Sequence, residues 1–558
     1  MIGVFGHWPA SGHGSSSVVS QMAAALRSNP KQEFVSAAAD AITIGGLHLP
    51  GDAPSWCAES RDGRGLLWIA GDVFATRAPL RARETAGDST WRQDIADALK
   101  RDGPAAINAL NGEFQLAFWD REARALTLAV DRFATLPLYW SANRSGFTFA
   151  FGVRGVLMAP DVAPNPDVTA IRQAVTFAGY RLGDKTNIVD VRAMRPAHTV
   201  HVTDPTRATT RCYWSWSDLP EPSALHLDEA VEELRPRWRT AVTRRLLGTK
   251  QPGQTLSGGR DSRAILAEAT LHAPSWTAFS YGIAGCDDVR FAQQAAHAAG
   301  ANYRFLPLYG RAHPDWLERR SAHIQRTDGL IDLIDLMHLE NHAELTAAVD
   351  CQLSGYLGDV IVGTTYDHVA SEVDATIALS FLGSPMSLSW DEARQAVREQ
   401  SQWDGSGATR ATIFEHKFAQ AIGRPNTALS ASVRVRRPFI DLDVVDFAMS
   451  LPSQVRAGLY DAWALSTYQT LFADIPVQKT GVPLGKSPLR LASVRVGRRV
   501  RRVANRVRRA AGLTVTSFSR TYTNDAEESA SPGIRERIEA TILAPQSTVV
   551  ELWGREMV

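Results

Sequence analysis

The chain is predicted to fold into two domains, an α+β domain followed by an α/β domain with a parallel sheet. Its 558 residues are too many for one compact core. Residues 1–215 consist mostly of short apolar segments that end at polar turns, with a few helices between them. From about residue 225, strands alternate with helices, which is typical of a parallel sheet covered on both faces. We therefore assign domains to 1–215 and 225–490, followed by a basic segment over 491–558.

In the first domain, four apolar or aromatic segments predict strands: 65–70, 114–119, 125–130 and 146–151. The polar stretch 120–124 should join two of them as a hairpin, and 93–102 has the pattern of a helix.

The second domain should begin with a long charged helix over 227–247. A glycine-rich turn follows at 257–262, then a strand over 275–281, an alanine-rich helix over 288–300 and a strand over 303–307. Ligands of such sheets bind beyond the carboxyl ends of the strands, where the glycine-rich turn should lie.

Composition excludes several classes of protein. The chain is 44% apolar and 21% charged with a net charge of +1, so no overall field favours nucleic acid. No run of 18 apolar residues predicts a membrane span, and the N-terminus lacks the pattern of a signal peptide. The four cysteines are far apart, which argues against structural zinc and disulfides and fits a reducing cytoplasm.

The turn at 257–262 reads Ser-Gly-Gly-Arg-Asp-Ser and has the chemistry of a phosphate site. Its glycines permit close approach of a ligand, and its amides with the following helix N-terminus would face an anion. Hydroxyl donors and a carboxylate that could hold Mg²⁺ come from Ser257, Ser262 and Asp261. The alternative is a Gly-Gly turn with an Asp-Ser cap.

This turn resembles the SGGxDS loop of ATP pyrophosphatases, which cleave ATP to AMP and pyrophosphate. The resemblance implies ATP and Mg²⁺ as cofactors. It implies a nucleotide site formed by Leu256, Ser257, Gly258, Gly259, Asp261 and Ser262, to which the second motif described below adds Gly355.

Further segments resemble the glutamine-dependent asparagine synthetase superfamily. In the first half these are 110–114, 117–121 and 131–139, which imply an Ntn-type glutaminase sandwich. That family uses a cysteine at position 2 to attack the glutamine amide. Here position 2 is Ile2, and 71–76 replaces the stretch that holds glutamine. We therefore expect this domain to be an inactive scaffold.

In the second half, 354–359 resembles the family's second nucleotide motif, although Leu357 replaces a glycine. The resemblance implies that Asp359 joins Asp261 around Mg²⁺. Tyr356 stands where β-lactam synthetases carry a tyrosine, and a phenol could position or deprotonate an attacking amine; the alternative is a buried aromatic residue.

Two later segments complete the resemblance. The stretch 436–441 is similar to the family's R-x-P-F-L-D segment, which we interpret as structural. Lys479, one of only seven lysines, matches the lysine that stabilises charge during amide formation. The alternative is a solvated loop lysine.

These observations predict ATP-dependent amide formation through an acyl-adenylate. Among the relatives, the chain looks most like the lasso peptide cyclases, which join a precursor peptide's N-terminal amine to an Asp or Glu side chain. Such an enzyme would work with a leader peptidase and a leader-binding protein. The alternatives are a β-lactam synthetase-like enzyme, an ammonia-dependent asparagine synthetase-like enzyme and a non-catalytic nucleotide-binding protein. The arginine-rich stretch 495–509 could be a solvated helix, a disordered segment or a docking surface for an acidic partner or a membrane.

Overall fold

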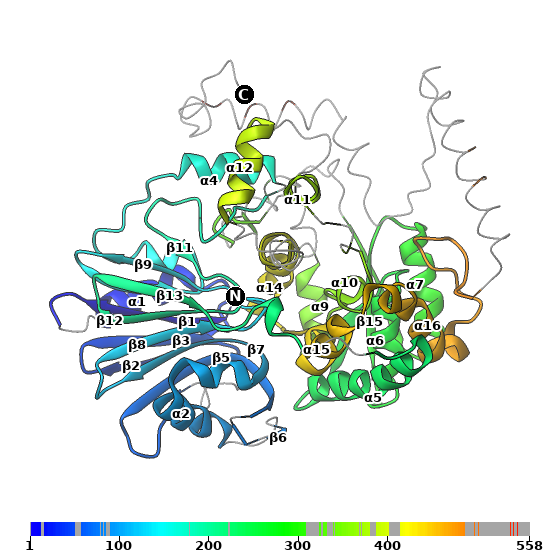
Figure 1. Cartoon of the computed structure of the whole chain (residues 1–558), viewed down its shortest axis with the longest axis horizontal. Coiled ribbons are helices and arrows are strands. Elements are labelled where there is room, and N and C mark those ends of the chain that lie inside the picture. The colour runs from blue at the N-terminus through cyan, green and yellow to red at the C-terminus, as the bar shows by residue number, and fades with distance from the viewer. Residues whose placement is uncertain are drawn as a thin grey trace.

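The computed structural model describes residues 2–308 except 13–15, 51–56, 79, 82, 85–89, 178 and 221–223. It also describes residues 341–485 except 366, 368, 370, 380–386 and 401–412, and scattered positions elsewhere. The segment 491–558, with its stretch 495–509, therefore lies almost wholly outside the described residues. The two domains lie side by side (Figure 1). Within the described part, no helix is long and apolar enough to cross a bilayer.

The N-terminal domain is built on two antiparallel sheets. The first has the order β11 (Arg192–Ala193), β9 (Tyr139–Asn143), β10 (Gly146–Ala150), β1 (Gly3–Pro9), β3 (Ile42–His48) and β2 (Glu33–Ala39). The second has the order β13 (Arg207–Cys212), β12 (His198–Asp204), β8 (Ala125–Val130), β7 (Leu110–Asp120), β5 (Gly65–Thr76) and β4 (Cys57–Glu59), and β6 (Arg83–Glu84) pairs with β5.

Strand alternation in β5 shows why these sheets pack in layers. Leu66 and Trp68 face the core between the two sheets, where the rings of Trp8 and Trp119 meet edge to face at 4.9 Å. The intervening Leu67 faces the opposite side, toward α2 (Trp91–Asp102). Helices α1 (Ser16–Leu26) and α3 (Val153–Val156) cover the outer face of the first sheet. The result is a four-layer helix–sheet–sheet–helix sandwich.

The C-terminal domain has one parallel sheet. Its order is β16 (Asn302–Pro307), β15 (Thr277–Gly282), β14 (Pro252–Thr255), β17 (Cys351–Leu353) and β18 (Arg434–Arg436). On β15, Ala278 belongs to the main core cluster and Phe279 to a smaller cluster that includes Leu345, so both faces are covered. The chain reverses its direction of strand addition between β14 and β17. This topological switch point is where sheets of this class bind ligands.

Helices fill the rest of this domain and the connections to it. They are α4 (Val168–Thr176), α5 (Leu227–Leu246), α6 (Asp261–Ala269), α7 (Asp287–Ala298), α9 (His342–Ala348), α10 (Gly358–Ile361), α11 (Glu372–Leu379), α12 (Trp390–Gln400), α14 (Arg424–Ala428), α15 (Leu442–Ser450) and α16 (Ser453–Phe472). A π-helix, η5 (Ile413–Gly423), precedes α14, and short 3₁₀ turns are η2 (Gly103–Ala109), η3 (Trp216–Asp218), η6 (Leu429–Ala431) and η7 (Pro438–Ile440).

The predicted fold class is confirmed in both halves. All four strands predicted in the first domain are present, as is the hairpin between β7 and β8. The predicted helices 227–247 and 288–300 correspond to α5 and α7, and the strand predicted at 275–281 begins two residues later. Strands β17 and β18 were not predicted, because three residues are too few to show alternation.

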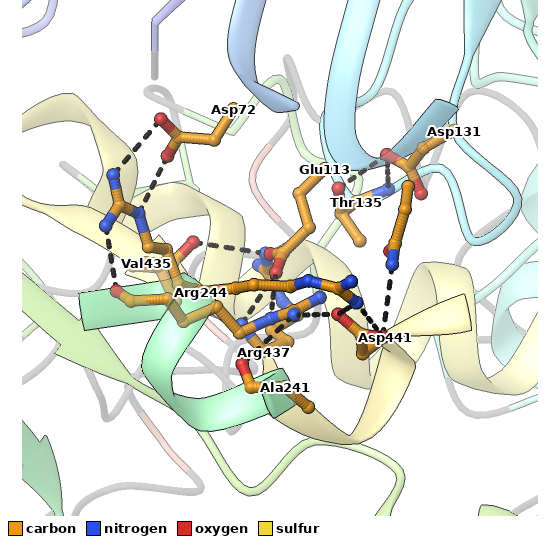
Figure 2. A network of polar contacts seen from close by, with 12 residues as sticks. Asp72, Glu113, Asp131, Thr135, Ala241, Arg244, Val435, Arg437 and Asp441 are labelled. Carbon is orange, nitrogen blue, oxygen red and sulfur yellow. Dashed lines mark hydrogen bonds and ion pairs between the residues drawn. The ribbon is translucent and has the colours of Figure 1, made fainter. Parts of the chain in front are cut away.

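Buried ion pairs join the two domains in what we call the interdomain network: Asp72, Glu113, Arg245, Arg436, Arg437 and Asp441 (Figure 2). Glu113, on β7, accepts hydrogen bonds from the Arg437 backbone amide at 2.7 Å and guanidinium at 2.8 Å. Arg245, on α5, donates to Glu113 at 3.3 Å and to Asp441 at 2.7 Å. Both arginines are almost fully buried.

A second set of contacts extends the interdomain network along β5 and β7. Arg436 donates to both carboxylate oxygens of Asp72, at 2.8 and 3.1 Å. Burial opposes ionisation of Asp72, but the Arg436 charge outweighs it and lowers the Asp72 pKa. Asn111 donates to Asp441 at 3.1 Å. The segment 436–441 therefore has a structural role, which is to hold the two domains together.

Replacing Glu113 tests how much the interdomain network contributes to the free energy of unfolding. Glu113→Gln removes the only network charge that compensates both Arg245 and Arg437. We expect it to lower the free energy of unfolding by about 3–5 kcal/mol, because breaking a buried pair leaves uncompensated charge. Urea unfolding followed by tryptophan fluorescence measures the effect. Glu122→Gln removes an exposed partner of Lys100 and should leave the midpoint nearly unchanged; equal midpoints for the two variants would contradict the interpretation.

Candidate active site

The glycine-rich turn connects β14 to α6 at the switch point of the parallel sheet. Its own hydroxyls hold its shape: Ser257 N–H donates to Ser262 Oγ at 3.1 Å, and Gly259 N–H donates to Ser257 Oγ at 3.1 Å. Leu256 is buried, and its amide donates to Phe279 O at 2.6 Å, which ties the start of the turn to β15. The turn is thus a fixed element rather than a loose connection.

The second motif lies directly against this turn. A Cβ on Gly355 would come within 2.9 Å of Asp261 Cβ, and one on Gly358 within 2.6 Å of Asp261 Cγ. Both glycines are therefore required by the close approach of the two motifs. Between them, Leu357 has φ +68°, a left-handed conformation that favours glycine. The departure from the family pattern at this position leaves the backbone turn itself in place.

The surroundings of Asp261 fit a carboxylate that could bind a cation. Its Oδ1 is buried and has no hydrogen-bond partner among the described residues. Burial raises its pKa well above the ordinary value, and the nearby Asp359 carboxylate raises it further. A divalent cation between these carboxylates and phosphate oxygens would offset both effects, and carboxylates are ligands that Mg²⁺ prefers. The described residues contain no cluster of three or more His, Cys, Asp or Glu side chains suited to a metal.

Lys479 lies beside the same turn. Its neighbour Gln478 donates a backbone hydrogen bond to Gly258 O at 2.9 Å. The Lys479 side chain is exposed, and its charge acts to lower the pKa of Asp261. The structure thus brings together the turn, Asp359 and Lys479, which are far apart in the sequence. Their individual roles stay predictions.

Tyr356 has a different position. It is buried in the main core cluster, and the Arg437 guanidinium lies 5.8 Å from its ring centre. Its hydroxyl faces Gly423, where an added Cβ would lie 3.2 Å away. Burial raises its pKa, so its phenol is neutral at pH 7. Its predicted contact with an attacking amine therefore stays a prediction, and the buried aromatic alternative describes its surroundings.

Asp288 is a residue of the site that sequence reasoning missed. It lies in the first turn of α7, is buried, and accepts a hydrogen bond from Gly258 N–H at 3.0 Å. Burial raises its pKa to about 6, with Asp287 adding to the shift and the Gly258 amide opposing it. The sequence feature that could have revealed it is the Asp-Asp pair at the start of a predicted helix that follows a central strand.

The buried position of Asp288 predicts that nucleotide affinity depends on pH. Below about pH 6 the folded chain protonates Asp288, which weakens the acceptor for Gly258 N–H. We therefore expect affinity for a nucleotide analogue to fall between pH 7 and pH 5. Asp288→Asn, which cannot titrate, should remove that step.

Stability should respond in the opposite direction. Because the folded pKa lies above the ordinary 3.8, the contribution of Asp288 to stability is fully present below pH 3.8 and is lost as pH rises through about 6. Asp288→Asn should thus raise the free energy of unfolding at pH 7, by about 1–3 kcal/mol. Isothermal titration and urea unfolding at both pH values measure the two effects. Asp391→Asn, at an exposed position of α12, is the control. If the nucleotide affinity of the wild-type chain does not change between pH 7 and pH 5, the raised pKa of Asp288 is contradicted.

Two protein-family models match the chain: a glutamine amidotransferase domain over residues 1–214 and asparagine synthase over residues 233–459. The chain is 27% identical over 237 residues to asparagine synthetase [glutamine-hydrolyzing] 3 of Bacillus subtilis (strain 168), covering 40% of this chain and 36% of that protein. It is 29% identical over 176 residues to amidase chry2 of Gibberella zeae, covering 31% and 25%.

The matches thus span about a third or less of these curated relatives. Among solved structures, an allosteric regulatory enzyme of purine biosynthesis aligns with a TM-score of 0.27 at 11% identity, covering 56% of this chain and 82% of that one. A score this low carries no argument about function. The domain matches agree with the observed sandwich and parallel sheet.

Proposed function

We propose that the chain forms an amide bond at the expense of ATP, because the asparagine synthase model matches residues 233–459 behind a glutamine amidotransferase domain match over 1–214. The observation that carries this proposal is the contact of Gly355 and Gly358 with Asp261 at the switch point of the parallel sheet. Two glycine-rich turns that meet there form a site for a polyphosphate with a bound cation.

Each part of the site has a role in this chemistry. The turn amides, Ser257 and Ser262 hold the phosphates, and Asp261 with Asp359 would hold Mg²⁺, which neutralises the leaving pyrophosphate. A carboxylate attacks the α-phosphorus, so pyrophosphate leaves and an acyl-adenylate forms. An amine then attacks the acyl carbon and AMP leaves. In this proposal, Lys479 stabilises the negative charge that develops in either step.

The amine does not come from glutamine in this proposal. Glutamine hydrolysis needs a nucleophile, and the chain has Ile2 where the family carries the cysteine. The stretch that replaces the glutamine-holding residues carries Asp72, which is paired with Arg436. That carboxylate is engaged in holding the domains together.

The finer proposal is ring closure of a lasso precursor peptide, between its N-terminal amine and an Asp or Glu side chain. It rests on the resemblance of the 257–263 motif to that of lasso peptide cyclases. It also rests on Ile2 in place of the glutaminase cysteine, since an amine within the peptide itself replaces ammonia from glutamine. The partners would be the precursor peptide, a leader peptidase and a leader-binding protein. The buried position of Tyr356 gives the β-lactam synthetase alternative no additional support.

The first test combines the chain, Mg·ATP and a candidate precursor peptide freed of its leader. We expect AMP and pyrophosphate in equal amounts and a peptide that has lost one water, detected by mass spectrometry. Asp261→Asn should reduce AMP formation by at least about 10²-fold, because the cation loses its buried ligand. Asp391→Asn, an exposed position on α12, is the control and should keep full activity. Formation of ADP instead of AMP would contradict the proposal.

A second test concerns the N-terminal domain. The wild-type chain should release no glutamate from glutamine, with or without ATP, because no thiol is present at position 2. A coupled glutamate dehydrogenase assay measures this. Glutamate release above the buffer blank would show that another nucleophile works in this domain.

A further inference from the structure

Arg263 is a buried cation that faces backbone carbonyls instead of a carboxylate. It lies in the first turn of α6 and is 1% exposed. Its guanidinium donates to Gly258 O at 3.1 Å, to Ile475 O at 3.1 Å and to Pro476 O at 2.5 Å. Within the described chain, no Asp or Glu forms an ion pair with it. Burial disfavours the Arg263 charge and the Asp288 carboxylate favours it without a direct ion pair, so the three carbonyls supply its direct hydrogen bonds.

Those acceptors belong to two different segments. Gly258 is part of the glycine-rich turn, whereas Ile475 and Pro476 begin the segment that carries Lys479. The Gly258 carbonyl also accepts the Gln478 backbone hydrogen bond at 2.9 Å. The approach is close, because a Cβ on Gly258 would lie 2.9 Å from Gln478 Cβ. One carbonyl of the turn is thus bonded both to Arg263 and to the residue that precedes Lys479.

We propose that Arg263 is a positioning residue that fixes the 475–479 segment to the glycine-rich turn, so that Lys479 and the phosphate site move as one body. The planar guanidinium can serve three carbonyls from two directions, which a lysine ammonium on a flexible stem cannot reproduce. The catalytic part of this inference rests on the proposed function, since Lys479 matters only if negative charge develops beside the turn. The structural part does not.

Hydrogen–deuterium exchange of the full chain tests the structural part. In Arg263→Lys and Arg263→Met, amides of 475–482 should exchange roughly ten- to hundredfold faster than in the wild type, because charge-assisted hydrogen bonds are lost. Peptides from β7 and α2 should not change. Arg235→Met, which removes an exposed arginine of α5 whose partner Glu232 is also exposed, is the matched control. Unchanged exchange over 475–482 in a folded Arg263→Met chain would overturn the proposal.

Chemical rescue separates positioning from general destabilisation. Guanidinium at low millimolar concentration should restore protection over 475–482 in Arg263→Ala and should not affect Lys479→Ala. If Arg263→Met does not fold, this rescue and Arg263→Lys decide the matter. Failure of guanidinium to change exchange in either arginine variant would count against the proposal.

The functional part uses Mg·α,β-methylene-ATP as the probe. Arg263→Lys should keep its dissociation constant within about threefold while AMP formation falls at least about tenfold, because the phosphate contacts remain and Lys479 is displaced. Lys479→Ala should then add little in the Arg263→Lys background. If the wild type binds no analogue, the proposed function fails, whereas the exchange experiment still decides whether Arg263 joins the two segments. If Arg263→Lys and Lys479→Ala reduce AMP formation additively, the proposed coupling of Arg263 to Lys479 is overturned.

Discussion

Glu113 between two buried arginines is the interaction on which the arrangement of the two domains depends. It projects from β7 of the sandwich and accepts hydrogen bonds from Arg245 and Arg437 of the other domain. Neither arginine is exposed, so removing Glu113 would leave Arg437 without its paired carboxylate and Arg245 with Asp441 alone. Packing of apolar surfaces alone would allow the domains to slide or rotate, whereas directional ion pairs fix one orientation. The ion pairs therefore add direction to an interface that also contains apolar contacts such as Phe133 against Phe414.

The segment 436–441 connects this interface to the candidate active site. Its arginines and Asp441 face the sandwich, while Phe439 between them packs within 2.9 Å of the Cβ position of Gly358. Phe439 also stacks near Trp238, with ring centres 4.3 Å apart. A displacement of the sandwich would thus be transmitted through a six-residue segment to the second nucleotide motif. This gives the N-terminal domain a structural role that does not depend on whether it hydrolyses glutamine.

Much of the fold could be predicted from the sequence because its patterns are local. Alternation predicts β8, and helical spacing predicts α5. The two nucleotide motifs could be placed near each other because both follow strands. Their direct contact through Gly355 and Gly358 could not be predicted, because it depends on which strands become neighbours, and β17 is too short to show a pattern.

The roles of Asp288 and Arg263 could not be predicted for a related reason. An aspartate at a helix start is ordinarily a cap, and an arginine on a helix is ordinarily solvated. Only the tertiary arrangement buries both side chains against the same glycine. For Tyr356, the motif position suggests chemistry, whereas the fold places the side chain in the core, and its predicted role stays a prediction.

The left-handed turn at Leu357 has one more consequence. A glycine there would move freely among several backbone states, but a leucine whose side chain is buried in the core cannot. The entropy of ordering this turn has therefore already been lost when the protein folds. Asp359, two residues later, is presented in a pre-organised position before any ligand arrives, at a cost of roughly 1–2 kcal/mol in backbone strain.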